Sequence, residues 1–339
     1  MKISILVPCY NEEKSVEACI KSCLNQTRKF DEIIFIDDCS TDRTPYILAQ
    51  YPDKIITKRT PNNTGNKSRA QEFGLQFVTG DVFVTTDADT ILDEHYVEEV
   101  EKCLNANPDA AAMAGYIESL PFNWLTLCRA YDYVIGQNLH KLAQSYINFI
   151  FVMPGAGSAF RTKIFKENIT FDHDTITEDL DFTYKLQNKK FRIAYCRKAI
   201  SYTQDPSNLK SYVNQMRRWY GGGWQNLLKH FAARVNFIKT FELSLVYAEG
   251  LFFSVLILLL PIVNLPLMLL FLSGYLSLAL VYGLLVAIKE RRAIFLLVPF
   301  PYMIIIFINS AIFLEQFIIE ILLQEKNLKW FKPERFFYN

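Results

Sequence analysis

The sequence lacks the short motifs that mark two common nucleotide-binding folds. It contains no G-x-G-x-x-G and no G-x-x-x-x-G-K-[ST], so a dinucleotide-binding fold or a P-loop ATPase would be without its phosphate-binding loop. It also has no excess of basic residues, because 36 Lys and Arg face 35 Asp and Glu, for a formal charge of +1. This balance gives no indication of a nucleic-acid partner.

Paired cysteines and a signal peptide are also missing. Seven cysteines are scattered along the chain without a C-x-x-C, which favours reduced thiols over a disulfide framework or a zinc site. The first apolar stretch, residues 3–7, is too short for a signal peptide and ends at Pro8. We therefore expect the amino-terminal part to be a cytosolic domain.

Apolar residues are unevenly distributed. They make up 51% of the 339 residues; residues 1–240 have a mixed composition, residues 241–323 are overwhelmingly apolar, and residues 324–339 form a basic tail. The apolar region contains three runs, 243–262, 265–288 and 293–323, each near or above the roughly 20 residues that span a hydrocarbon core. We expect a cytosolic domain followed by a transmembrane region, and hence an integral protein of the cell membrane.

The orientation of the apolar runs follows from the charges around them. The cluster at residues 289–292 is basic, so the positive-inside rule places it in the cytosol, and the first two runs form a hairpin. We expect the third run to be a third span. A single span would place the basic tail outside, against the positive-inside rule, whereas a re-entrant or interfacial segment would keep the tail inside. Glu315 and Glu320 in this run either line an acceptor channel or face other helices or the membrane interface; the sequence leaves both readings open.

Predicted strands and helices alternate in the first part of the chain. The strands are at residues 3–7, 32–36, 54–57 and 81–85, and the helices at 13–24, 41–50 and 66–78. This order predicts an α/β fold with a mostly parallel sheet covered by helices. Ligands of such sheets bind at the carboxyl ends of the strands.

Three of the predicted strands end in polar segments. Residues 8–13 follow the first strand, residues 37–42 the second, and the pair Asp87 and Asp89 the fourth. One such pair is a weak signal, and Asp37 or Asp42 could simply cap a helix. Their shared sheet edge instead favours a nucleotide held through carboxylates and a hard divalent cation.

Two later segments add polar groups. In T-E-D-L-D at residues 177–181, Thr177 could cap a helix whose first turn is acidic, or one carboxylate could be a general base for an alcohol. In Q-M-R-R-W at residues 215–219, Arg and Trp suit a phosphate and a sugar ring, or anchor the chain at a membrane surface. The glycine triplet 221–223 ends the helix or lets the backbone approach a ligand.

In this order the segments resemble family 2 glycosyltransferases with a GT-A fold, from residue 3 to about residue 224. D-D-C-S-T-D at residues 37–42 is similar to the family's D-D-G-S-T-D, with Cys39 in place of Gly. N-K-S-R-A at residues 66–70 is similar to its G-K-x-x-A, with Asn66 in place of Gly. The other matching segments are V-P-C-Y-N-E at 7–12, D-A-D at 87–89, G-A-G-S-A-F-R at 155–161, T-E-D at 177–179 and Q-x-x-R-W at 215–219, the last typical of membrane-embedded cellulose, chitin and hyaluronan synthases.

The resemblance implies an inverting, metal-dependent hexosyltransferase. Asp179 would be the catalytic base, with Glu178 beside it, and Asp89 with Asp87 would bind Mg2+ or Mn2+. The UDP-sugar donor would be bound by Pro8, Tyr10, Glu12, Asp38, Lys67, Asp87 and Arg218. A glycan or lipid-linked acceptor would be bound by Gly157, Ser158, Gln215 and Trp219.

The product class stays open at this point. The Q-x-x-R-W box favours synthesis of a polysaccharide or cell-surface glycan. Transfer of a single sugar to a polyprenyl or dolichyl phosphate, or to a lipid-linked glycan, is the alternative. A non-catalytic membrane adaptor would be expected to have lost one of the acids, and all of them are present.

Overall fold

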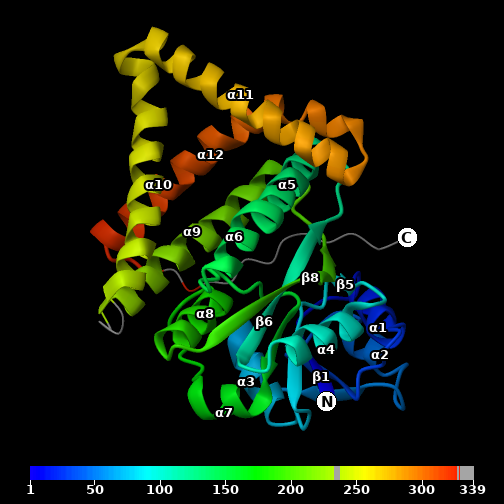
Figure 1. Cartoon of the computed structure of the whole chain (residues 1–339). Coiled ribbons are helices and arrows are strands. Elements are labelled where there is room, and N and C mark those ends of the chain that lie inside the picture. Colours follow the sequence, from blue (N-terminus) through cyan, green and yellow to red (C-terminus); the bar gives the residue numbers. More distant parts are fainter. Residues whose placement is uncertain (233–236, 327, 329–339) are drawn as a thin grey trace.

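The computed structural model describes residues 1–232, 237–326 and 328. Within these residues an eight-stranded sheet has the order β3-β2-β1-β4-β7-β6-β8-β5 (Figure 1). The strands are β1 Ile3–Cys9, β2 Glu32–Asp37, β3 Ile56–Arg59, β4 Val82–Thr85, β5 Thr90–Leu92, β6 Ala110–Ser119, β7 Ser158–Arg161 and β8 Arg192–Thr203. The predicted α/β class is confirmed, and the third strand begins two residues later than expected.

The sheet is parallel over β3-β2-β1-β4 and mixed beyond. Strand β7 runs antiparallel to both β4 and β6, and β5 runs antiparallel to β8. The carboxyl ends of β1, β2 and β4 therefore meet at one edge, as the sequence pattern predicted. This arrangement brings the polar segments after these strands together.

Two hydrophobic cores cover the two faces of the sheet. Ile5 of β1 packs with α1 and α4 on one face, whereas its neighbour Leu6 packs with α3, α7 and α8 on the other. Such alternation follows from the two-residue period of a strand, and burial on both faces explains its continuous apolar sequence. The helices are α1 Val16–Leu24, α2 Thr44–Leu48, α3 Lys67–Leu75, α4 Tyr96–Ala106, α7 Thr162–Asn168 and α8 Glu178–Asn188.

A helical arm joins the sheet to the apolar helices. It comprises α5 Trp124–Ile135, the π-helix η1 Gly136–His140 and α6 Lys141–Tyr146, and it lies beside α9 Leu209–Ala232 (Figure 1). Leu125 and Tyr131 of α5 share a core with Tyr212 of α9 and Ile305 of α12. The arm therefore fixes the position of the apolar helices relative to the sheet.

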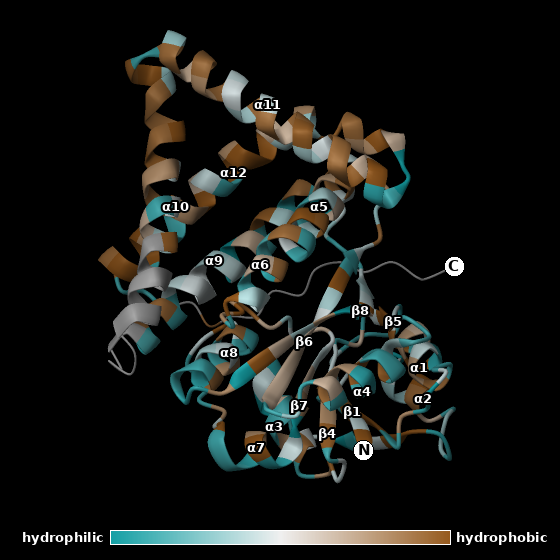
Figure 2. Ribbon diagram, viewed as in Figure 1, coloured by the Kyte–Doolittle hydropathy of each residue, from teal (hydrophilic) through white to brown (hydrophobic). Residues whose placement is uncertain are grey.

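Three helices are long and apolar enough to cross a membrane, over Val246–Val263, Leu265–Glu290 and Pro299–Leu322. They belong to α10 Phe237–Val263, α11 Leu265–Glu290, and α12 Pro299–Phe317 with η3 Ile318–Leu322; the short η2 Ala293–Leu296 precedes α12. Figure 2 shows apolar residues concentrated on these helices, away from the sheet. They overlap the three predicted apolar runs, while most of the basic tail 324–339 lies outside the described residues.

The glycine triplet does not end a helix, contrary to one of the two readings of the sequence. It lies inside α9, where the glycines allow close packing against other elements. A Cβ on Gly222 would lie 2.3 Å from Thr177 Oγ1, and one on Gly223 would lie 2.5 Å from the Tyr247 hydroxyl. Steric demand between α9, the start of α8 and α10 therefore accounts for these glycines.

The acidic residues of the third apolar run pair with α9. Arg217 donates to both carboxylate oxygens of Glu315, at 2.8 and 2.7 Å, and Gln225 donates to Glu320 at 2.8 Å. Of the two readings of these acids, contact with another helix is the one the geometry favours.

Candidate active site

A cavity of about 920 Å³ lies along the carboxyl ends of β1, β2 and β4 and reaches α5, α6, α9 and the apolar helices. Its volume is at the upper end of the range of pockets that bind a small molecule, roughly 300–1,000 Å³. The predicted site residues that line it are Pro8, Tyr10, Glu12, Asp38, Lys67, Asp87, Asp89, Glu178, Asp179, Gln215, Arg218 and Trp219. Segments far apart in the sequence thus meet around one space.

Gly157 and Ser158, which the sequence predicted to contact an acceptor, are not among the residues that line this cavity. Gly157 has φ +85°; its N–H donates to the carbonyl of Thr85 at 2.8 Å, and its carbonyl accepts from the N–H of Gly115 at 3.1 Å. The buried hydroxyl of Ser158 donates to the carbonyl of Pro154 at 2.7 Å. Gly155 and Ala156 of the same segment do line the cavity, and an acceptor contact of Gly157 and Ser158 stays a prediction.

Lys67 connects the two acidic motifs. Its Nζ lies 2.5 Å from Asp87 Oδ1 and 3.0 Å from Glu178 Oε1. Burial disfavours the ammonium form, but Asp87 and Glu178 outweigh it and raise the pKa of Lys67. The lysine therefore stays charged and holds the end of β4 against the start of α8.

Asp179 has the properties of a base that works near neutral pH. Burial and the neighbouring charge of Glu178 raise the pKa of its carboxyl to about 6, against the opposing effects of Lys67, the Leu180 N–H and Arg218. The backbone N–H of Leu180 donates to Oδ1 at 2.9 Å, and that of Gly155 donates to Oδ2 at 3.2 Å. These bonds fix the orientation of the carboxylate toward the cavity.

Asp38 is fixed by two threonines. Its carboxylate accepts from the Thr60 hydroxyl at 2.8 Å and from the Thr64 hydroxyl at 2.7 Å, and the side chain is buried. Cys39, which follows it, has φ +59°, a conformation that costs a non-glycine residue roughly 1–2 kcal/mol. This backbone conformation explains why the related motif has Gly at this position.

Asn66, which stands where the related motif has its other Gly, caps α3. Its side chain accepts from the backbone N–H of Ser68 at 2.8 Å, in the manner of a helix N-cap. Thr177, in contrast, stands at the N-cap of α8 without a side-chain cap bond. Its hydroxyl instead accepts from Asn226 of α9 at 3.0 Å.

The D-x-D pair fits a hard divalent cation as regards its donor atoms. Asp89 is 5% exposed and lines the cavity together with Asp87. Among the described residues no group of three or more His, Cys, Asp and Glu side chains could hold a metal ion. Because Mg2+ retains waters and shares carboxylates with substrate phosphates, two acids at a diphosphate site are a sufficient protein contribution.

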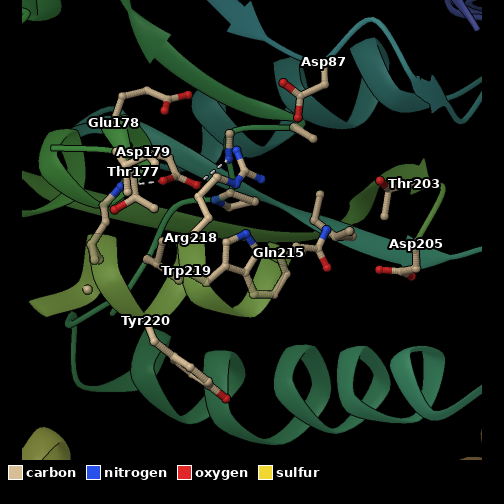
Figure 3. A pocket seen from close by; sticks show the side chains of 18 of the residues that line it. Asp87, Thr177, Glu178, Asp179, Thr203, Asp205, Gln215, Arg218, Trp219 and Tyr220 are labelled. Atoms are coloured by element: carbon tan, nitrogen blue, oxygen red, sulfur yellow. Dashed lines mark hydrogen bonds between the residues drawn. The ribbon is translucent and has the colours of Figure 1, made fainter. Parts of the chain in front are cut away.

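The Q-x-x-R-W box lies on α9, and Gln215, Arg218 and Trp219 line the same cavity. In the view of Figure 3, Glu178, Asp179 and Arg218 lie on one side of the cavity, Thr203 and Asp205 on the other, and Gln215 and Trp219 between them. The positive charge of Arg218 opposes the rise in the pKa of Asp179 that burial and Glu178 cause. The box is therefore adjacent to the T-E-D acids, although more than 30 residues separate them in sequence.

Comparison with known families agrees with this geometry. Residues 4–169 match the model described as "Glycosyl transferase family 2". These residues are a family 2 glycosyltransferase domain.

The family 2 domain has curated relatives named as glycosyltransferases. A poly-beta-1,6-N-acetyl-D-glucosamine synthase of Staphylococcus epidermidis is 27% identical over 72% of this chain and 59% of that protein. An N-acetylglucosaminyltransferase of Azorhizobium caulinodans is 24% identical over 71% of this chain and 65% of that protein. The chain thus spans about three fifths of the length of the curated relatives it matches.

Two solved structures share the fold of the family 2 domain. A mannosyltransferase from Pyrobaculum calidifontis, in complex with GDP-Man and Mn2+, has a TM-score of 0.59 at 19% identity, over 88% of this chain and 85% of that one. Residues 1–349 of S. aureus TarS, in complex with UDP, have a TM-score of 0.51 at 20% identity, over 67% of this chain and 65% of that one. At these identities the likeness establishes the GT-A-type fold.

The structure adds site residues that the sequence motifs did not identify. Arg129 of α5 is 5% exposed and lies among the rings of Tyr133, Tyr212 and Trp219. Its Nε is 3.5 Å from Asp205, which lines the cavity. A basic residue in an aromatic-rich helix was visible in the sequence, but its burial beside the Q-x-x-R-W box depends on the packing of α5 against α9.

A second addition is Lys141 at the start of α6. It is 7% exposed and lines the same cavity. Tyr133 of α5 and Gln137 of η1 line it as well, so the α5–η1–α6 arm forms part of the candidate site.

Proposed function

We propose that this chain transfers a sugar from a UDP-sugar to an acceptor at a membrane, with inversion of the anomeric carbon. The observation that carries the proposal is the single cavity around Asp38, Asp87, Asp89, Asp179 and Arg218. A nucleotide subsite, a diphosphate subsite and a buried base therefore share one space. A non-catalytic adaptor has no need of this complete set.

The proposed reaction is one in-line displacement. An acceptor hydroxyl oxygen bonds to the anomeric carbon while the bond from that carbon to the diphosphate oxygen breaks. The hydroxyl proton passes to Asp179, and the leaving UDP takes the electron pair. General-base catalysis of this kind contributes typically about 10²–10⁴-fold.

The remaining groups bind the donor and stabilise the leaving group. Asp38 and the loop from Pro8 to Tyr10 would hold the uridine, and Arg218 would contact the diphosphate. Asp89, with Asp87 beside it, would hold Mg2+ or Mn2+, whose charge neutralises the negative charge that grows on the leaving diphosphate. Trp219 would stack on the acceptor.

The relatives favour a particular donor and product. Two of them are named for N-acetylglucosamine transfer or polymerisation, so UDP-N-acetylglucosamine is the first donor to test. Together with the Q-x-x-R-W box they support polysaccharide synthesis. The three apolar helices support an integral membrane protein, with the family 2 domain in the cytosol.

The test is a transfer assay on the full chain in detergent or nanodiscs. UDP-N-acetylglucosamine, UDP-glucose and GDP-mannose would each be supplied with Mn2+ or Mg2+, and nucleotide release and labelled product measured, with Asp179→Asn as the background. A long polymer supports the synthase, and a lipid-extractable product supports single-sugar transfer. Nucleotide release equal to that of Asp179→Asn with every donor and acceptor would overturn the proposal.

A further inference from the structure

His173 joins the segment that leads into the T-E-D motif to the start of α3. It belongs to residues 170–177, which directly precede α8. Its Nδ1 lies 2.7 Å from the Ser68 hydroxyl, and its Nε2 lies 2.8 Å from Glu72 Oε2, both on α3. A serine, a histidine and a glutamate in this order resemble the triad of a hydrolase, but Ser68 is 3% exposed and does not line the cavity. The three residues therefore form a link between two elements.

The link persists whether or not the imidazole ring of His173 is charged. The Glu72 carboxylate only accepts hydrogen bonds, so the proton of that bond is on Nε2. In a neutral ring, Nδ1 accepts from the Ser68 hydroxyl. In an imidazolium, Nδ1 donates to the same oxygen, and the hydroxyl proton turns to Asn66 Oδ1, which is 2.8 Å away. Both protonation states thus keep the two contacts with α3.

The backbone at His173 is in a left-handed conformation. Its φ is +56°, which a residue with a Cβ adopts only where its surroundings hold it. Asp172 lies 2.7 Å from Lys185 of α8 and 2.6 Å from Lys229 of α9. Asp174 lies 2.7 Å from the same Lys229. The turn therefore directs His173 to α3, while the residues on either side of it bind α8 and α9.

Two neighbouring contacts join α3 to the start of α8 and the segment before it. Inside the cavity, Lys67 Nζ lies 3.0 Å from Glu178 Oε1 and 2.5 Å from Asp87 Oδ1. Outside the cavity, the next residue of α3, Ser68, meets His173. Lys67 thus touches both the donor side and the base side of the site, and the contact of Ser68 with His173 restrains its position from one residue away.

From this arrangement we infer that His173 is a positioning residue for the transfer reaction. Through Ser68 it holds the start of α3, and with it Lys67, against the acids at the start of α8. His173 does not line the cavity, so its effect on the reaction passes through Lys67. The inference rests on the proposed function, because it assigns a further residue to the site of that reaction.

The pH dependence of transfer reports the position of Lys67. Burial and Glu178 raise the pKa of Asp179, and the charge of Lys67 opposes them. Arg218 of α9 and Lys141 of α6 are further cations that interact with Asp179, and neither belongs to α3. If α3 moves away, the pKa of Asp179 should rise, and the acid limb of kcat/KM should move to higher pH.

Two variants at position 173 separate the side chain from the backbone. Gly and Asn both adopt the left-handed conformation readily, so neither variant strains the turn. His173→Gly removes the link; kcat should fall by roughly tenfold or more, since a misplacement of about 1 Å costs up to about 10²-fold. The affinity for UDP should change little, and the acid limb should move to higher pH. His173→Asn places an amide where Nδ1 lies, so it should restore most of the rate and the position of the limb.

Asp174→Asn is the matched control. It removes a contact of the same segment with α9 instead of α3, from a side chain that is 45% exposed. It should lower the unfolding temperature slightly and leave the acid limb in place. Ser68→Ala removes the partner of His173. Combined with His173→Gly, it should shift the limb no further than the larger of the two single shifts, because both variants act through one contact.

Hydrogen exchange measured by mass spectrometry tests the link without any need for activity. In the full chain in detergent, His173→Gly should speed exchange of the backbone amides of residues 68–75 as well as those of residues 173–180, because α3 loses a restraint. Asp174→Asn should leave exchange in α3 unchanged.

An acid limb and a kcat that both stay unchanged in His173→Gly would refute the inference and leave the histidine a purely structural role, whatever the unfolding temperature. An equal shift of the limb in Asp174→Asn would refute it as well, by attributing the effect to general loosening of the segment. Absence of transfer by the parent chain with every donor would count against the proposed function alone. In that case, unchanged exchange of α3 in His173→Gly would still refute the link, and faster exchange would support it.

Discussion

The guanidinium carbon of Arg129 lies 4.9 Å from the centre of the Trp219 ring, so a buried cation stacks on the aromatic residue of the Q-x-x-R-W box. The same guanidinium faces Asp132 at 3.4 Å and Asp205 at 3.5 Å. Asp132 in turn accepts from Tyr302 of α12. Through these contacts, Arg129 links the orientation of Trp219 to an apolar helix.

Arg129→Lys should therefore weaken acceptor binding more than donor binding. Lysine keeps the charge but lacks the planar group that stacks on an indole, so the acceptor KM should rise several-fold while the donor KM changes little. Steady-state kinetics with each substrate varied would measure this. Arg129→Met, which removes the buried cation that faces Asp132 and Asp205, should instead lower stability by about 3–5 kcal/mol in detergent unfolding. Equal changes in both KM values for Arg129→Lys would contradict the positioning role.

Asp179→Asn should abolish transfer while retaining UDP binding. The amide keeps the shape of the side chain but accepts no proton, so the rate should fall by about 10²–10⁴-fold. Nucleotide-release kinetics and calorimetry with UDP would separate the two effects. Asp181→Asn is the matched control, because Asp181 pairs with Lys185, Lys229 and His230. Its loss should act mainly on the unfolding temperature and only weakly on the transfer rate. Wild-type transfer by Asp179→Asn would exclude it as the base.

The transfer rate should fall as the pH drops through about 6, the value to which burial and Glu178 raise the pKa of Asp179. A base acts only when it is deprotonated, so kcat/KM falls on the acid side of this pKa. Glu178→Gln removes a charge that raises the pKa and should move the acid limb to lower pH. A limb that stays in place, or moves upward, would show that another group controls the profile.

Asp89→Ala should remove the metal dependence of donor binding. Calorimetry of UDP-sugar binding with and without Mn2+ should show a clear enhancement in the wild-type protein and little in the variant, because the carboxylate ligand is lost. Asp109→Ala removes a carboxylate that is 63% exposed and should leave the enhancement intact. An unchanged response to Mn2+ in Asp89→Ala would refute the metal role.

Gly222→Ala should destabilise the protein and disturb the T-E-D segment. The added Cβ would lie 2.3 Å from Thr177 Oγ1, and overpacking of this kind costs typically 1–3 kcal/mol. Gly136→Ala is the control, because nothing lies within 4 Å of its Cβ position and its backbone is helical, so a small gain in stability is expected. Thermal unfolding in detergent would compare the two; an unfolding temperature for Gly222→Ala at or above that of the parent would be incompatible with the packing described.

Sequence alone was sufficient for the elements whose signals are local. The strands β1, β2 and β4 are short apolar runs that each end in polar residues, and the rule for parallel sheets placed those ends at one edge. Asn66 at the start of α3 was visible as a departure from the motif, and its capping bond gives the physical reason. The acids of the D-x-D and T-E-D motifs were likewise found in the sequence, because chemistry restricts those positions to few residue types.

The tertiary structure decided what depends on packing between distant segments. The glycines of α9 are explained only by Thr177 and Tyr247 lying against them, and Glu315 finds Arg217 only when α12 packs on α9. The burial of Lys141 and Arg129 is set in the same way by the α5–η1–α6 arm, because whether a long basic side chain reaches water depends on its neighbours in space. The sequence by itself determined which residues could do chemistry, and the fold decided which of them meet inside the cavity, because that depends on packing between segments that are distant in sequence.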